Sequence, residues 1–193
     1  LYFVTANHVV ERFVADGSAF ATIFGESIEL EAASFDRCAL SDVAICDITT
    51  ACPHLPKDAI IPCLDQNQRP AEADRYIIIG YPSNRNKIGG FKSLDRRCFR
   101  VIAPPYEGST PSNCQIKSPI LMRHHGRNGY TQNGNSGRTL PDMPGVSGGP
   151  VVAITRDRNS SSGRLRLAGV IVEYYGRESC FVASDISDVV SLM

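Results

Sequence analysis

The feature of this chain that most limits its fold is a succession of short β-branched and aromatic segments separated by clusters of Gly, Pro and Asn. Ser27-Ile28-Glu29-Leu30-Glu31 alternates polar and apolar residues, as a strand with one solvated face does. No stretch in the body of the chain keeps a 3.6-residue apolar period for long. The pattern predicts an all-β fold. The expected strands cover residues 2–5, 19–24, 27–32, 43–48, 76–79, 99–102, 118–122, 151–154, 165–172 and 180–183.

One short helix is predicted at the C-terminal end. Ser184 can cap its first turn, and Asp185 and Asp188 suit the positive end of a helix dipole. The apolar residues of this segment fall on one helical face: Ile186, Val189, Val190 and Met193.

The 193 residues are enough for two small β lobes that share an interface. The polar run Asp65–Pro70 is the best candidate linker between them. We therefore expect a first lobe over residues 1–68 and a second over residues 69–193.

Composition excludes several classes of partner. Lys and Arg together number 20, as do Asp and Glu, so there is no general attraction to nucleic acid or to an anionic membrane. No apolar run is long enough to span a bilayer. Seven cysteines, an odd number without a regular framework, favour a reducing compartment such as the cytoplasm. Three disulfides and one free thiol in a periplasmic or secreted protein stay open as the alternative.

The most specific segment for chemistry is Gly145-Val146-Ser147-Gly148-Gly149-Pro150, which leads into an apolar strand. A serine nucleophile for acyl transfer needs an exposed hydroxyl beside backbone N–H groups that can meet a developing oxyanion. Flanking glycines allow the backbone angles and close approach that this requires. The alternative is a Gly-rich hairpin turn with an incidental serine.

Two further segments gain meaning from their order along the chain. The segment Phe3–Val10 begins as a strand that runs directly into His8. Asp42 stands at the start of the apolar strand Val43-Ala44-Ile45. Each is common in isolation, where the histidine is more often structural and the aspartate a turn residue. The order His, Asp, Ser on an all-β background differs from the orders of the α/β-hydrolase and subtilisin triads.

These segments resemble the trypsin-like, or chymotrypsin-fold, serine peptidases, and are closer to the bacterial and HtrA-like branch than to the digestive enzymes. Thr5-Ala6-Asn7-His8-Val9-Val10 resembles the T-A-x-H-V-V block around the family's histidine. Asp42-Val43-Ala44-Ile45 resembles its D-[IV]-A-[VL] block, and Gly145–Pro150 its G-x-S-G-G-P block.

The resemblance implies two six-stranded antiparallel β-barrels with an active site in the cleft between them. His8 would be the base, Asp42 its orienting partner and Ser147 the nucleophile, with the amides of Gly145 and Ser147 as the oxyanion hole. The implied function is a serine endopeptidase that acts on polypeptide substrates, without a cofactor or metal, and that is often fused to regulatory domains.

The chain departs from the family pattern at three places. Val146 stands where digestive members carry an aspartate that pairs with a newly cleaved N-terminus, so activation by trimming is not expected. Val9 replaces a cysteine that other members use in a disulfide. The family has a strand before its histidine block, so we expect the first barrel to be incomplete at its N-terminus.

Substrate contacts are expected from Asp142, before the nucleophile, and from the strand edge Val172-Glu173-Tyr174, which would hydrogen-bond an extended peptide. Asp142 could attract a basic side chain or be a solvated loop residue. Cys46, Cys52, His54 and Cys63 match no usual zinc spacing. The main alternatives are a catalytically silent peptide-binding or sensor module with the same fold, and an esterase or acyltransferase with the same triad.

Overall fold

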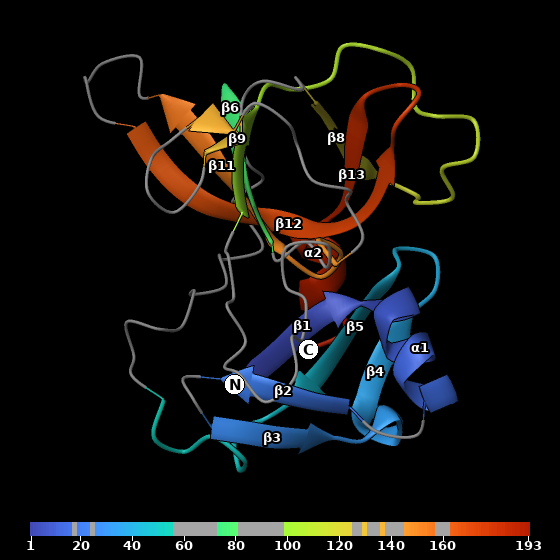
Figure 1. Cartoon of the computed structure of the whole chain (residues 1–193), viewed down its shortest axis with the longest axis vertical. Helices are drawn as coiled ribbons and strands as arrows, with labels where there is room; N and C mark the ends of the chain where they lie inside the picture. The colour runs from blue at the N-terminus through green and yellow to red at the C-terminus, as the bar shows by residue number, and fades with distance from the viewer. Residues whose placement is uncertain are drawn as a thin grey trace.

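The structure is a computed structural model of the chain. It describes residues 1–16, 19–23, 26–55, 73–80, 99–124, 129–130, 136–137, 145–156 and 163–193. These residues form antiparallel β-sheets in two lobes, one above the other in Figure 1. The predicted boundary at residues 68 and 69, with its linker, lies outside the described residues.

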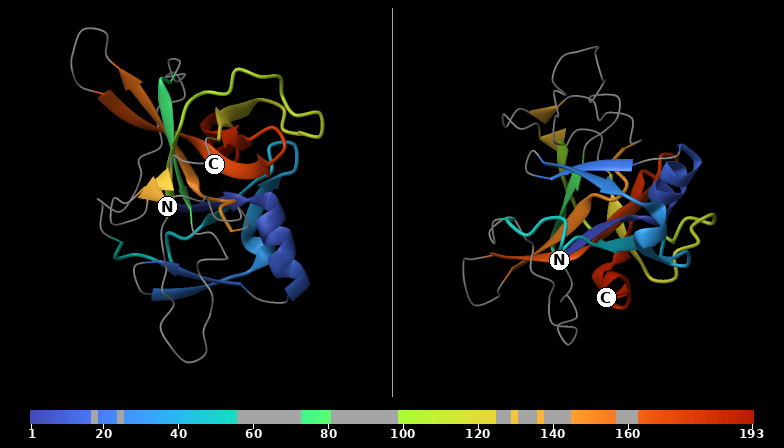
Figure 2. Two further views of the ribbon diagram at one scale, coloured as in Figure 1. Left: turned by 45° about the horizontal axis from the view of Figure 1, so that its top comes forward. Right: turned by 90° about the horizontal axis from the view of Figure 1, so that it is seen from below.

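The first lobe is built on a three-stranded sheet with the order β1-β5-β4 and on a separate hairpin of β2 and β3. Figures 1 and 2 show the hairpin on the side of this lobe away from the second lobe. The strands and helices of the lobe are β1 (Tyr2–Ala6), α1 (Asn7–Asp16), β2 (Ala19–Ile23), β3 (Glu26–Leu30), a 3-10 turn (Ala32–Ser34), β4 (Phe35–Cys38) and β5 (Val43–Asp47).

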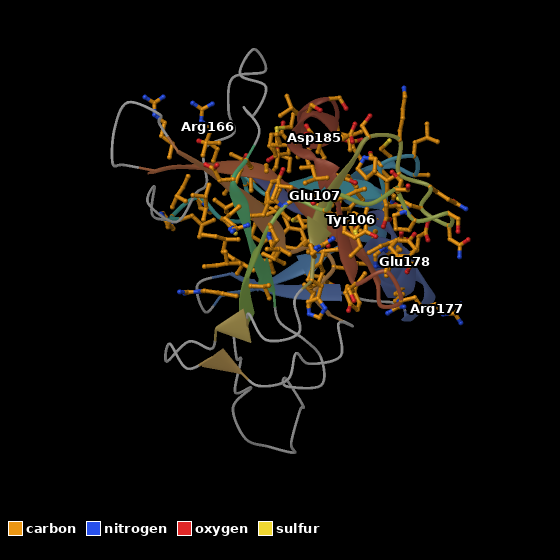
Figure 3. All side chains as sticks on the ribbon, turned by 90° about the horizontal axis from the view of Figure 1, so that it is seen from above. Tyr106, Glu107, Arg166, Arg177, Glu178 and Asp185 are labelled. Atoms are coloured by element: carbon orange, nitrogen blue, oxygen red, sulfur yellow. The ribbon has the colours of Figure 1, made fainter. Side chains whose placement is uncertain are left out.

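The second lobe contains an eight-stranded sheet with the order β10-β9-β7-β6-β11-β12-β13-β8. Its central strand β12 is the longest, and Arg166 near its start lies across the lobe from Arg177 just beyond its end (Figure 3). The elements are β6 (Arg75–Gly80), β7 (Phe99–Ala103), β8 (Pro119–Arg123), β9 (Gly129–Tyr130), β10 (Ser136–Gly137), β11 (Pro150–Arg156), β12 (Gly163–Tyr175), β13 (Cys180–Asp185) and α2 (Ile186–Val190).

Apolar side chains from both lobes meet in two shared clusters. In one, Val43 and Ile45 of β5 pack with Val170 of β12 and with Ile186 and Val189 of α2. The other joins Ala6, at the end of β1, to residues of β12 and β13. Burial of this surface is what holds the two lobes in one orientation.

The all-β prediction is confirmed, and this two-lobed antiparallel architecture agrees with a chymotrypsin-like fold. Each predicted strand is present, with ends that agree with the prediction or differ from it by up to three residues. Among the described residues, the second lobe has an eight-stranded sheet, and the first lobe is divided between a three-stranded sheet and a hairpin. Strands β4, β9 and β10 were not predicted.

Helix α1 is the main departure from the predicted pattern. Val9 and Val10 are β-branched and locally favour a strand, yet they lie in the first turns of a ten-residue helix. Their spacing from Phe13 and Val14 does contain the i, i+3, i+4 pattern of a helix. Neither α1 nor α2, the α-helices of the described residues, is long and apolar enough to cross a membrane.

The C-terminal helix is confirmed, but its cap is one residue later than expected. Asp185, rather than Ser184, accepts a hydrogen bond from the Ser187 amide at 2.8 Å. Ser184 instead lies fully buried at the end of β13, and Met193 is exposed.

The close contact between β12 and β13 at Gly169 leads to a stability prediction. A Cβ atom at this position would lie 2.0 Å from the carbonyl oxygen of Ser184, a backbone atom that cannot move aside cheaply. We expect Gly169→Ala to lower the free energy of unfolding by about 1–3 kcal/mol in urea denaturation. Gly176→Ala is the matched control, because its Cβ would make an ordinary 3.6 Å contact, and we expect a change within about 0.5 kcal/mol. Equal stabilities of the two variants would contradict this packing.

Candidate active site

Asp42 organises the part of the site that comes from the first lobe. It lies between the turn after β4 and the start of β5, in a left-handed backbone conformation with φ 51°. Its main-chain oxygen accepts from the Asn7 amide at 2.9 Å, and its Oδ1 accepts from the His8 amide at 2.9 Å. The first amides of a helix have no partner within the helix, so Asp42 caps α1 from a distant part of the sequence.

The other carboxylate oxygen of Asp42 contacts the His8 ring. Oδ2 lies 2.6 Å from Nδ1 of the imidazole, a short, charge-assisted distance. This geometry puts the Nδ1 proton between the two groups and leaves Nε2 as the acceptor in neutral histidine. The hydrogen bond to Asp42 raises the pKa of His8, while partial burial and the charge of Arg12 oppose the rise and Glu173 adds to it.

A residue of the second lobe anchors the turn that carries Asp42. The buried hydroxyl of Ser184 donates to the main-chain oxygen of Ser41, the residue before Asp42. Sequence reasoning placed Ser184 at a helix cap and gave it no part in the site. Its side chain points at a loop more than a hundred positions earlier, a contact for which the local sequence carries no signal.

Ser147 occupies the second position of a tight turn at the start of β11. The Gly149 amide donates to the Val146 oxygen at 3.0 Å, and Gly148 between them has φ 86°. A bond of this kind with a positive φ at the third residue is the signature of a type II β-turn, which calls for glycine there. A Cβ on Gly148 would also lie 2.5 Å from Oγ1 of Thr5. The serine is therefore presented on a turn whose shape depends on its glycines.

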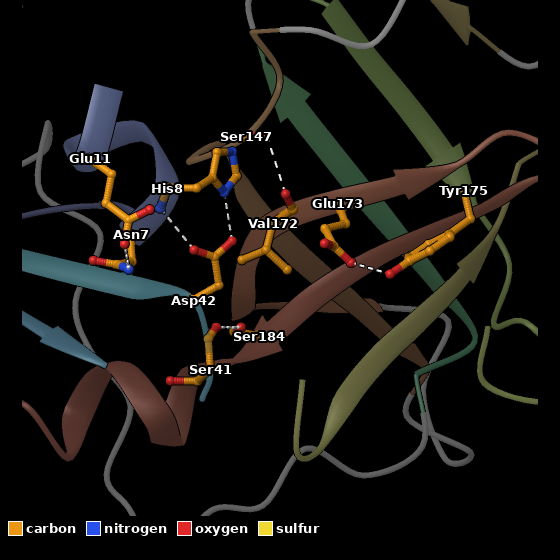
Figure 4. Close-up of polar contacts among 10 residues, drawn as sticks. All are labelled: Asn7, His8, Glu11, Ser41, Asp42, Ser147, Val172, Glu173, Tyr175 and Ser184. Carbon is orange, nitrogen blue, oxygen red and sulfur yellow. Dashed lines mark hydrogen bonds and ion pairs between the residues drawn. The ribbon is translucent and has the colours of Figure 1, made fainter. Parts of the chain in front are cut away.

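The same contacts bring Ser147 to the interface of the lobes. Thr5, against which Gly148 packs, lies on β1 three residues before His8. The Ser147 hydroxyl donates to the main-chain oxygen of Val172 on β12 at 3.3 Å, and Glu173 beside it influences the His8 pKa. Figure 4 shows Ser147 on the side of the His8 ring opposite Asp42.

Two backbone amides of the turn already donate hydrogen bonds to main-chain oxygens of the protein. Gly148 donates to the Ile171 oxygen at 2.8 Å, and Gly149 donates within the turn. The amides of Gly145, at φ 90°, and Ser147 precede them in the sequence. The amides of Gly148 and Gly149 are therefore not available to a group that binds at this turn.

The strand edge expected to contact substrate lies beside Ser147. β12 pairs with β11 only as far as Val170, and Val172 is the extra residue of a bulge in its pairing with β13. In the described part of the chain, Val172–Tyr175 therefore pair along one edge only. Val172 itself is buried. Asp142 lies outside the described residues.

Tyr174 belongs to an aromatic cluster. Its hydroxyl is 2.9 Å from Nδ1 of His124, and their rings meet edge to face at 5.2 Å. Phe181 contacts both rings, with centroid distances of 5.2 Å to His124 and 4.9 Å to Tyr174. Burial raises the pKa of the Tyr174 hydroxyl. The cluster fixes the side chain of Tyr174 next to the open strand edge.

Comparisons with known proteins give a structural likeness without a family. No protein-family model and no curated protein matches the chain. Among solved structures, the chain is similar to the NS6 protease from murine norovirus 1, with 16% sequence identity and a TM-score of 0.44. The alignment covers 95% of this chain and 80% of that one.

The His8–Asp42 pair leads to a prediction for the titration of His8. We expect NMR titration to give a His8 pKa above the ordinary value of about 6.5, and a lower one in Asp42→Asn. A raised folded-state pKa stabilises the fold fully below about pH 6.5, and this contribution is lost as pH rises through the folded-state value. A His8 pKa that is the same in both proteins would contradict the pairing; His8→Gln assigns the signal.

The Ser184 anchor leads to a second prediction. Ser184→Ala leaves the Ser41 oxygen buried without this donor, which we expect to cost about 1–3 kcal/mol in the free energy of unfolding. The freed turn should also let Asp42 move, so the His8 pKa should fall towards its ordinary value. Ser187→Ala is the control, because its hydroxyl is exposed and binds only Asp185 at 2.7 Å. An unchanged His8 pKa in Ser184→Ala would show that the anchor does not position Asp42.

Proposed function

We propose that this chain is a serine endopeptidase with Ser147 as nucleophile, His8 as general base and Asp42 as the group that orients the base. The observation that carries the proposal is the use of both Asp42 oxygens on His8, one on its amide and one on Nδ1. A structural histidine needs no such double restraint. An imidazole that must hold one tautomer and accept a proton at Nε2 does.

The chemistry follows from these roles. The Ser147 oxygen attacks the carbonyl carbon of a peptide bond while its proton passes to Nε2 of His8. The carbonyl oxygen becomes an oxyanion that the amides of Gly145 and Ser147 stabilise. His8 then gives the proton to the leaving amine as the C–N bond breaks, and water hydrolyses the acyl-enzyme by the same steps. Asp42 stabilises the imidazolium formed in between.

The hydrogen bond of Ser147 to Val172 is compatible with this cycle. Its length of 3.3 Å is long for a bond between a hydroxyl and a carbonyl oxygen, so little free energy is lost when the hydroxyl turns to His8. The edge of Val172–Tyr175 that pairs with no other described strand supports the choice of a polypeptide substrate. An extended peptide can add to this edge as a strand and place its carbonyl at Ser147.

Labelling with a fluorophosphonate probe tests the activated serine. We expect covalent modification of Ser147, located by peptide mass spectrometry, and its complete loss in Ser147→Ala. Asp42→Asn should slow labelling strongly, because the base loses its tautomer and its charge partner. Ser187→Ala should be labelled as the wild type is.

Two results would count against the proposal. If Ser147→Ala is still labelled by the probe, the nucleophile is a residue other than Ser147. A folded wild-type protein that is never labelled would favour the silent peptide-binding module. Digestion of denatured protein, compared with hydrolysis of simple esters, then separates the peptidase from an esterase.

A further inference from the structure

The carboxylate of Glu173 is an anionic group that the triad does not contain. Glu173 follows Val172 on β12 and is half-buried. Its Oε2 accepts a hydrogen bond from the Tyr175 hydroxyl, which lies on the same face of the strand two residues on. Figure 4 shows this pair beside Val172, on the strand that Ser147 contacts.

Nothing in the described part of the chain neutralises this charge through an ion pair. Two salt bridges between described residues join the Leu1 ammonium to Asp47 and His8 to Asp42, and neither involves Glu173. Burial, followed by the Glu173 carboxylate, raises the pKa of the Tyr175 hydroxyl, so the hydroxyl stays protonated and remains a donor. Tyr175 therefore orients the Glu173 carboxylate without removing its charge.

The position of Glu173 relative to Ser147 fixes which part of a bound peptide it would meet. The Ser147 hydroxyl lies at the main-chain oxygen of Val172, so the residue whose carbonyl is attacked lies opposite Val172. A peptide that joins the sheet antiparallel, as all its paired strands do, then runs backward along β12. The second residue before the scissile bond lies opposite Glu173, and directly opposed residues of an antiparallel pair project to the same face.

We propose that Glu173 is a specificity-determining residue that binds the cationic side chain of a Lys or Arg at the second position before the scissile bond. This inference rests on the proposed peptidase function and deepens it. A half-buried carboxylate with one neutral donor gains a charge-assisted hydrogen bond from such a side chain. An acidic side chain there would meet a like charge at close range.

His8 makes the preference depend on Glu173. The imidazole becomes cationic during the reaction, and a second cation beside it would oppose that change. The Glu173 charge acts on His8 in the favourable sense, as its effect on the His8 pKa indicates. The Glu173 carboxylate attracts a basic residue to this position. Without Glu173, the imidazolium of His8 would repel that residue.

Cleavage of a proteome-derived peptide library, with the cut sites read by mass spectrometry, tests the assignment. We expect Lys and Arg to be enriched at the second position before the cut by wild-type protein. Peptide pairs that differ only there should show a kcat/KM about three- to tenfold higher for Arg than for norleucine at low salt. The ratio should shrink as salt screens the half-buried charge.

Variants separate selectivity from structure. Glu173→Gln keeps the shape and should lose the Arg preference, and Glu173→Lys should reverse it in favour of acidic residues. Glu178→Gln is the matched control, an exposed acid in the turn after β12 that should leave the preference intact (Figure 3). Urea unfolding of each variant checks that the fold is retained.

The outcomes distinguish this inference from the proposal on which it rests. Cleavage by wild-type protein with no basic enrichment, or the same enrichment in Glu173→Gln, overturns the role of Glu173 and leaves the peptidase in place. Complete absence of cleavage by folded wild-type protein, together with absence of fluorophosphonate labelling, overturns both.

Discussion

The rest of the candidate site depends on the way Asp42 binds the start of α1. Its main-chain oxygen and both carboxylate oxygens are used on Asn7 and His8. A left-handed backbone costs a residue other than glycine about 1–2 kcal/mol. The hydrogen bonds that this conformation makes possible, each worth about 0.5–1.5 kcal/mol net, offset that cost. Helix capping and orientation of the imidazole are thus one interaction, and neither can change without the other.

The second requirement is that two lobes keep a fixed relation, because His8 and Ser147 come from different ones. Three contacts of different kinds do this. The apolar cluster of β5, β12 and α2 supplies hydrophobic attraction between the lobes. The Ser184 hydroxyl holds the Asp42 turn, and the absence of a side chain at Gly148 lets the Ser147 turn approach Thr5. Groups that react with each other must keep their distance to within a fraction of an ångström, which polar and steric contacts at the boundary can enforce better than apolar packing alone.

β12 connects the core of the fold to the strand edge at which we propose that substrate binds. Its first part is an ordinary interior strand between β11 and β13, and its last part leaves β11 and is bent by the bulge at Val172. Bulges re-aim side chains and end a pairing, and here the bulge occurs where the strand passes Ser147. One strand therefore contributes to the core, receives the serine hydroxyl and presents Glu173 and Tyr174 at an edge that pairs with no other described strand.

The sequence by itself determined the fold class and most of the strands, and it suggested the three residues that we propose for catalysis, because alternation of side chains and glycine-flanked motifs are local properties. It did not determine α1, since Val9 and Val10 favour a strand until Asp42 caps the helix from 34 positions away. The roles of Ser184 and of the fixed Glu173 carboxylate were also decided only by the tertiary structure. Ser184 looks like a helix cap in the sequence, and only the packing of the lobes turns its hydroxyl to Ser41. Local patterns record which way a strand faces, whereas contacts between lobes depend on the whole chain having folded.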